Sequence, residues 1–119
     1  MTKNYIQCKN IVGKQKRIQR VGINDTISDI MRIKPGDYLR WIITQEHETQ
    51  IKLQKVPPGE ENITLPDVIN KTVKVSNHHN RITIPNTIRL AANINQGDTL
   101  IWKIEQDNLY SDTIEVLKK

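Results

Sequence analysis

The chain lacks several features that would indicate secretion, a disulfide framework or catalysis. Its 119 residues include one cysteine, Cys8, which has no second thiol for an internal disulfide or a CxxC motif. No apolar run approaches the roughly 20 residues that span a bilayer, and the N-terminus has no signal-peptide core. No Ser/His/Asp set, carboxylate pair in an apolar context or glycine-rich phosphate loop is recognisable. We therefore expect a cytoplasmic protein that is not an enzyme and needs no cofactor or metal.

What the chain does contain is an internal repeat. Residues 20–43 and 81–104 align without a gap at an offset of 61, and ten of the 24 aligned pairs are identical. The identical pairs are Arg20/Arg81, Ile23/Ile84, Thr26/Thr87, Ile27/Ile88, Ile33/Ile94, Gly36/Gly97, Asp37/Asp98, Leu39/Leu100, Trp41/Trp102 and Ile43/Ile104. We expect the alignment to continue into 51–55 and 114–118 after two extra residues in the second copy. Units of about 45 residues bury little surface alone, so the copies should share one core.

Each repeat is expected to run strand, short helix, turn, strand, turn, strand. In the second copy, residues 81–84 alternate with period two, and Pro85 suits the first turn of a helix over 86–93. In the first copy, Asn24 or Asp25 can cap the corresponding helix. A Gly-Asp pair follows each helix and predicts a tight reversal into the next strand.

The two tryptophans are predicted to lie in the core. Trp41 and Trp102 each share a strand face with Leu and Ile, a pattern more typical of packing than of base stacking. Further strands are expected at 5–12 and 72–75, ahead of the two repeats. The chain is thus divided into a first repeat (1–56), a connector (57–70) and a second repeat (71–119), which together form one domain. The connector is rich in Pro, Gly and acids, and its apolar residues indicate that it packs against the fold.

The net charge of +5 is unevenly distributed. Residues 1–20 contain six basic residues and no acidic one, namely Lys3, Lys9, Lys14, Lys16, Arg17 and Arg20, whereas the connector contains Glu60, Glu61 and Asp67 and no basic residue. A basic cluster of this kind fits a polyanionic partner. It is equally compatible with solvated lysines that protect an edge strand from aggregation.

The second copy carries a recognisable motif, Asn80-Arg81-Ile82-Thr83-Ile84-Pro85-Asn86-Thr87-Ile88-Arg89, followed by Gly97-Asp98-Thr99-Leu100. This motif resembles the AbrB/SpoVT/MazE-like swapped-hairpin DNA-binding domain over residues 72–118, and a weaker version covers 11–55. The resemblance implies a mainly β fold with two short helices, in which the tandem repeats exchange hairpins to form a β-barrel. Most members of the family combine two chains, so here one chain would form an intramolecular pseudo-dimer.

The resemblance also implies a basic face toward double-stranded DNA. The matching positions are Lys74, Arg81 and Arg89 in the second copy and Lys14 and Arg20 in the first. The first copy departs from the family pattern. Asn24 stands where the pattern has proline, and Ser28 with Asp29 occupies the helix site where the second copy has Arg89. Lys16 and Arg17 in the adjoining loop could compensate. From the residues alone, a two-fold arrangement would place Arg20 and Arg81 at equivalent points, and guanidinium groups suit phosphates and guanine edges.

Two histidines complete the candidate DNA-binding set. His78 and His79 lie in the loop that corresponds to 16–18, and adjacent strand residues point to opposite faces, which is poor geometry for one metal ion. A solvated turn is the simplest interpretation of this pair, and a DNA-facing loop is the alternative.

The sequence therefore favours a transcriptional regulator that binds double-stranded DNA through a basic face and is associated with the nucleoid. Two alternatives stay open. One is an antitoxin-like protein that binds DNA weakly and holds a toxin partner through a tail, for which the 57–70 connector could substitute. The other is an architectural protein that coats DNA. Further pairing of pseudo-dimers is also open, and no membrane partner is expected.

Overall fold

Apart from one additional short strand in the first half, the two halves of the chain have the same order of strands around one short helix. In the computed structural model, the described residues are 5–15, 18–45, 49–76, 81–105 and 111–117. The elements in chain order are β1 (Tyr5–Ile11), β2 (Gly13–Gln15), β3 (Ile18–Gly22), α1 (Asp25–Met31), β4 (Tyr38–Thr44), β5 (Gln50–Val56), β6 (Ile69–Lys74), β7 (Arg81–Thr83), α2 (Asn86–Ala92), β8 (Thr99–Glu105) and β9 (Ser111–Leu117). The chain is mainly β with two short helices, as the alternating patterns predict.

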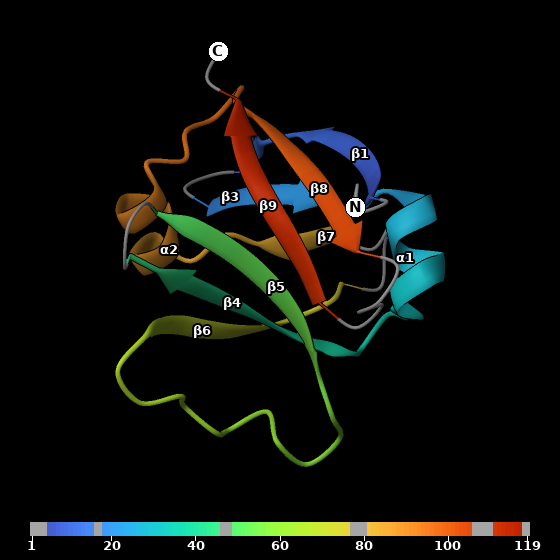
Figure 1. The fold of residues 1–119 in the computed structure, drawn as a ribbon, viewed down its shortest axis with the longest axis vertical. Coiled ribbons are helices and arrows are strands. Elements are labelled where there is room, and N and C mark those ends of the chain that lie inside the picture. The colour runs from blue at the N-terminus through green and yellow to red at the C-terminus, as the bar shows by residue number, and fades with distance from the viewer. Residues whose placement is uncertain (1–4, 16–17, 46–48, 77–80, 106–110, 118–119) are drawn as a thin grey trace, which may run out of the picture.

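The strands form two sheets to which both repeats contribute (Figure 1). The larger sheet has six strands in the order β1-β8-β9-β5-β4-β6, and the smaller has three in the order β2-β3-β7. The first strand of each repeat pairs with the strand that follows the helix of the other repeat, since β1 lies beside β8 and β6 beside β4. Both sheets are open, and neither closes into a barrel among the described residues.

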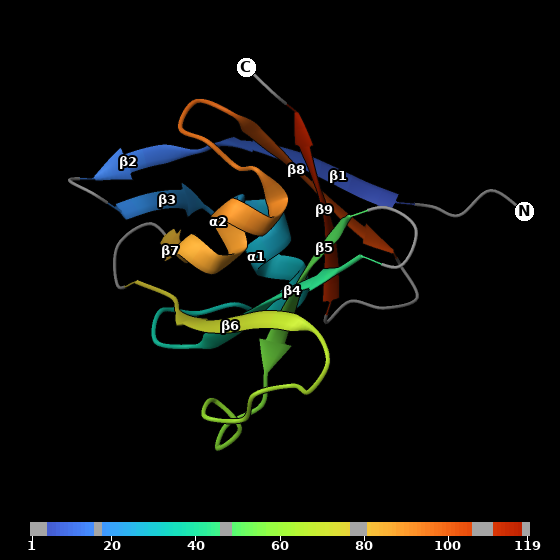
Figure 2. The ribbon, with the colours of Figure 1, turned by 90° about the vertical axis from the view of Figure 1, so that its left-hand side faces the viewer.

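The helices lie between the sheets. Figure 2 shows β3 and β7 on one side of the molecule, β5 and β9 on the other, and α1 and α2 in between. Val21 on β3 and Ile82 on β7 face the same core as Leu39, Leu53 and Leu100 of the large sheet, and each is at most 1% exposed. A half-chain could not enclose these side chains alone, so the two repeats bury their apolar surface in one shared core.

The strand register corrects one prediction from the sequence. Trp41 lies opposite Leu53, and Trp102 lies opposite Ile114. Leu53 therefore corresponds to Ile114 at the same offset of 61, and the predicted two-residue insertion in the second copy is wrong. Similar letters favoured the shifted alignment, but a strand alternates faces, so the position opposite each tryptophan fixes the register.

The length difference lies instead before the second strand of each repeat. Cys8 lies opposite Trp102, and Lys71 lies opposite Trp41. Arg20 follows Cys8 by 12 positions, whereas Arg81 follows Lys71 by 10. The two additional residues of the first copy accompany the short strand β2, which the sequence pattern did not predict.

Each helix ends in the same way in both copies. Arg32 and Asn93 close α1 and α2 in the left-handed conformation, with φ of 56° and 55°. At the start of α1, Asn24 accepts a hydrogen bond from the Thr26 N–H at 2.9 Å, as the capping prediction requires. Pro85 precedes α2 and makes no side-chain capping bond.

The Gly-Asp turns join the two repeats. Gly36 N donates to Val75 O at 3.0 Å, and Gly97 N donates to Val12 O at 2.9 Å. Both glycines have positive φ, 92° and 90°, a conformation that side chains with a Cβ rarely adopt. Each turn of one repeat is thus fastened to the chain just after the first strand of the other.

Both tryptophans are core residues, as predicted. Trp41 and Trp102 are 0% exposed, and their ring centroids lie 6.5 Å apart at an interplanar angle of 40°. Trp41 Nε1 donates to Thr83 O at 3.1 Å and so links the large sheet to the small one. Trp102 Nε1 donates to Asn10 Oδ1 at 2.7 Å, within the large sheet. Base stacking by either ring is therefore excluded in this fold.

Candidate nucleic-acid interface

The pairing of β3 with β7 brings the two repeated arginines together. In this antiparallel pair Arg20 lies opposite Thr83, and Gly22 lies opposite Arg81. Between them Val21 pairs with Ile82, and both of these side chains are turned into the core. Since neighbouring residues of a strand point to opposite faces, Arg20, Gly22, Arg81 and Thr83 share the outer face. We refer to these four residues as the arginine face.

The arginine face has approximate two-fold symmetry. Arg20 and Arg81 are diagonal neighbours across the strand pair, so their backbone positions are separated by about 7–8 Å. The major groove of B-DNA is about 12 Å wide, and two arginines at this spacing can therefore enter one groove together. Glycine stands opposite each of them, because Gly13 of β2 pairs with Arg20 and Gly22 pairs with Arg81. On its other side Arg20 has Thr83 of β7, which is the cross-strand neighbour that adds a side chain.

The two arginines differ in burial. Arg81 is exposed, whereas Arg20 is half-buried, and its buried Nε has no hydrogen-bond partner among the described residues. Buried donors usually find an acceptor, so a guanidinium with an unused N–H is under-satisfied in the free protein.

Two further residues of the predicted DNA-binding set, Lys74 and Arg89, lie within eight positions of Arg81 in the sequence. Lys74 ends β6 and is exposed, with its Nζ 6.0 Å from the centroid of the Tyr38 ring. Two residues later Ser76 N donates to Arg81 O at 2.9 Å, which ties the end of β6 to the start of β7.

Arg89 lies in the last turn of α2 and is half-buried. The equivalent residue of α1, Ser28, is 4% exposed, so this helix position faces inward more than the family pattern implies.

The remaining predicted residues are only partly described. Lys14 lies in β2 opposite Gln19 rather than opposite Arg20, and its side chain is outside the described set. Lys16, Arg17, His78 and His79 lie outside the described residues altogether.

Sequence reasoning missed the uncharged members of the face. Gly22 and Thr83 occupy equivalent positions at the offset of 61, but they are different residues, so the repeat alignment does not mark them as a pair. Antiparallel pairing of the two copies about Val21 and Ile82 would have revealed them. That pairing requires the second strands of the repeats to meet, and the alignment of letters does not show which strands meet.

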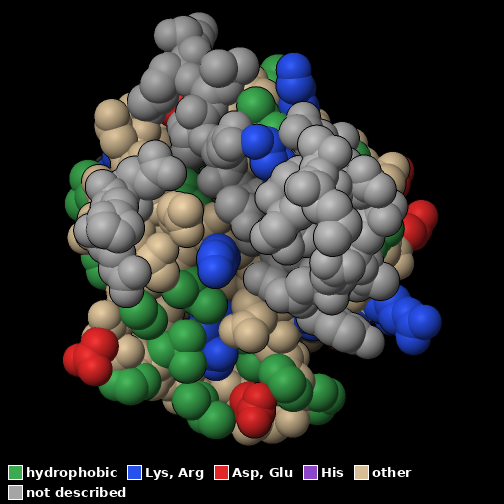
Figure 3. Space-filling model, viewed as in Figure 1, with side chains coloured by type: hydrophobic (Ala, Val, Ile, Leu, Met, Phe, Trp, Pro, Cys, Tyr) green, Lys and Arg blue, Asp and Glu red, His purple; other side chains and the backbone are tan. Residues whose placement is uncertain are grey.

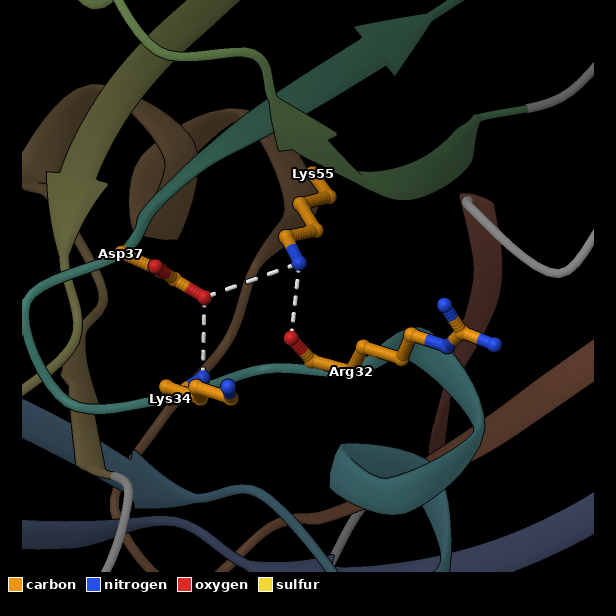
Figure 4. Close-up of polar contacts among 4 residues, drawn as sticks. All are labelled: Arg32, Lys34, Asp37 and Lys55. Carbon is orange, nitrogen blue, oxygen red and sulfur yellow. Dashed lines mark hydrogen bonds and ion pairs between the residues drawn. The ribbon is translucent and has the colours of Figure 1, made fainter.

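A polar pocket lies at the end of α1. It has a volume of about 580 Å³ and is lined by Ser28, Asp29, Arg32, Ile33, Lys34, Asp37 and Lys55. Figure 4 shows Lys55 reaching both Arg32 O, at 2.7 Å, and the Asp37 carboxylate, at 3.7 Å. Asp37 Oδ2 also accepts the Lys34 N–H at 2.9 Å. These groups hold the helix end and the Gly-Asp turn, and the Arg32 side chain points away from them. The pocket is therefore best explained as part of the scaffold.

Other kinds of site find no support in the described part of the chain. Within it, no cluster of three or more His, Cys, Asp or Glu residues could hold a metal ion. None of its helices combines the length and the apolar character needed to cross a membrane. No protein-family model, curated protein or solved structure matches this chain. A function must therefore be inferred from the chain's own geometry.

Proposed function

We propose that this protein binds double-stranded DNA through the arginine face and acts as a transcriptional regulator on the nucleoid. The observation that carries the proposal is the register of β3 with β7, which sets Arg20 and Arg81 as a two-fold pair on the outside of the small sheet. Duplex DNA is itself two-fold symmetric, so a symmetric pair of guanidinium groups can make equivalent contacts with both strands.

The proposed fold is that of a swapped-hairpin pseudo-dimer contained in one chain. The exchanged pairing of β1 with β8 and of β6 with β4 supports this assignment. So do the reciprocal bonds from Gly36 to Val75 and from Gly97 to Val12. A single chain would then present the DNA-facing surface that two chains build in the family that the sequence resembles.

A pair of variants at Thr83 tests the proposed face. Thr83 is half-buried and lies directly opposite Arg20. Thr83→Glu would place a carboxylate beside the guanidinium and in the path of the phosphates, so duplex affinity should fall by about tenfold or more at low salt. Thr83→Gln has nearly the same shape without the charge and should bind as the wild type does.

Fluorescence anisotropy with a labelled duplex measures both affinities, and thermal unfolding verifies that both variants are folded. Equal affinities for the Glu and Gln variants would contradict the assignment of the face. A comparison of several unrelated duplexes separates a regulator from an architectural protein, because only a regulator should prefer particular sequences.

A further inference from the structure

The connector between the repeats forms an acidic surface that is held in one shape. Figure 1 shows it as the loop between β5 and β6 at the lower end of the molecule. Glu60 and Asp67 are exposed, Glu61 is half-buried, and Ile63 is 50% exposed. In the space-filling view of Figure 3, acidic side chains lie among hydrophobic ones at this end. The connector therefore combines negative charge with an accessible apolar group.

The buried residue Arg40 anchors the connector. Arg40 is 5% exposed, and its Nη2 donates to Ile63 O at 3.0 Å and to Glu60 O at 3.3 Å. Burying a guanidinium costs several kcal/mol unless acceptors compensate for the lost water. Here the acceptors are two backbone carbonyls of the connector, and the Nε has no partner among the described residues. The equivalent residue of the second repeat is Ile101, so this anchor is not needed for the shared fold.

A second anchor holds the other end of the connector. Asn70 Nδ2 donates to Val68 O at 2.8 Å and to Leu65 O at 3.0 Å, while Leu65 N donates to Asn70 Oδ1 at 3.3 Å. These bonds fix the backbone on both sides of Ile63. A loop that is already ordered loses little conformational entropy when it binds, which favours a role in recognition.

The charge of the connector indicates what it can bind. Residues 57–70 carry three acidic side chains and no basic one, so this surface repels phosphate and attracts basic groups. The same chain presents basic groups on the arginine face, namely the exposed Arg81 and the half-buried Arg20. Figure 2 shows the connector at the lower end of the molecule and β3 with β7 on one side, so the anchored loop does not cover its own molecule's face.

We propose that the acidic connector of one molecule docks on the arginine face of a second copy and competes there with DNA. This inference rests on the proposed function, because the docked connector would block the face that is proposed to bind DNA. Each molecule has one connector and one face, so the contact is heterologous and adds further copies in chains unless it closes into a ring. Self-association should therefore increase with protein concentration, weaken with salt and be reversed by duplex DNA.

Two variants separate the partners of this contact. One replaces the connector acids by their amides, Glu60→Gln, Glu61→Gln and Asp67→Asn together. The other removes the face, Arg20→Ala with Arg81→Ala. Sedimentation velocity at about 50 mM salt should show the wild type heavier than the 13.8 kDa monomer as its concentration rises, and each variant as a monomer alone. Lys52→Gln changes an exposed lysine elsewhere and should associate as the wild type does.

Mixing the two variants gives the decisive result. The face variant still has its connector and the connector variant still has its face, so a mixture should form a heterodimer of twice the monomer mass and nothing larger. This outcome also shows that both variants are folded. A wild type that stays monomeric at low salt, or a mixture that does not associate, would overturn the inference. If the connector variant binds the duplex, the proposed DNA-binding function stands whatever the result for self-association. If the folded wild type associates with itself but does not bind the duplex, the proposed function fails and the docking contact stands.

Discussion

The two repeats agree in the tryptophans of the core and in the Gly-Asp turns, and they differ in several charged residues. Trp41 and Trp102 are equally buried, and the turn aspartates make matching bonds, Asp37 Oδ2 with Lys34 N at 2.9 Å and Asp98 Oδ2 with Asn95 N at 2.8 Å. These shared groups build the core and fasten one repeat to the other. The comparison therefore separates residues that serve the fold from residues that are free to serve a function.

Several of the differing positions exchange a charged side chain for an uncharged one. Arg89 in α2 corresponds to Ser28 in α1, Arg40 in β4 to Ile101 in β8, and Lys55 in β5 to Val116 in β9. At two of these three pairs the first copy carries the charge. At the arginine face, in contrast, both copies supply an arginine. The two copies thus share an arginine at equivalent points of one surface, while each copy also has charged residues that the other lacks.

The largest effect should come from removing either tryptophan. Trp41→Ala and Trp102→Ala should each lower the free energy of unfolding by about 3–5 kcal/mol, as expected for a fully buried aromatic side chain. Urea unfolding followed by circular dichroism measures the loss in each variant. A variant that retained the wild-type midpoint would contradict the shared core at that position.

A smaller loss distinguishes the hydrogen bonds of the two indoles. Asn10→Ala should cost about 1–3 kcal/mol, because it leaves the Trp102 N–H without its acceptor in a buried place. In a Trp102→Phe background the same change should cost much less, since Phe has no N–H to satisfy. Equal losses in both backgrounds would show that Asn10 contributes by another route.

Replacing the turn aspartates should lower the free energy of unfolding by a still smaller amount, and the amount should differ between the two turns. Asp98 is 3% exposed, whereas Asp37 is half-buried and lies beside Lys55 at the polar pocket. We expect Asp98→Ala to cost about 1–2 kcal/mol and Asp37→Ala about 0.5–1 kcal/mol, because water replaces a lost bond more easily at the exposed turn. The midpoints of urea unfolding give both values, and the reverse order would show that burial does not determine this difference.

The sequence predicted the elements better than it predicted their neighbours. The repeat, the capped helix after Asn24, the Gly-Asp turns and the buried tryptophans all follow from local spacing and chirality, which are visible in the letters. The register of β9 and the strand β2 were missed, because they depend on which strands pair across the two copies.

Of the proposed site, Arg20 and Arg81 could be named in advance. Gly22 and Thr83 could not, because they join the arginines only after β3 and β7 pair. The anchoring of the connector by Arg40 was likewise outside the reach of sequence patterns, since residues 20 and 23 positions apart must meet.

The salt dependence of duplex binding by Arg20→Ala and Arg81→Ala tests most directly whether the two repeats share one DNA-binding face. Each phosphate contact contributes about 0.9 to the slope of log affinity against log salt. Both variants should stay folded, bind the duplex about tenfold more weakly at low salt and lose about one from that slope. Equal losses would support a face built by both copies. If Arg81→Ala alone weakened binding, the first copy would serve as a structural partner. If neither change affected affinity or slope, the arginine face would not be the DNA-binding surface.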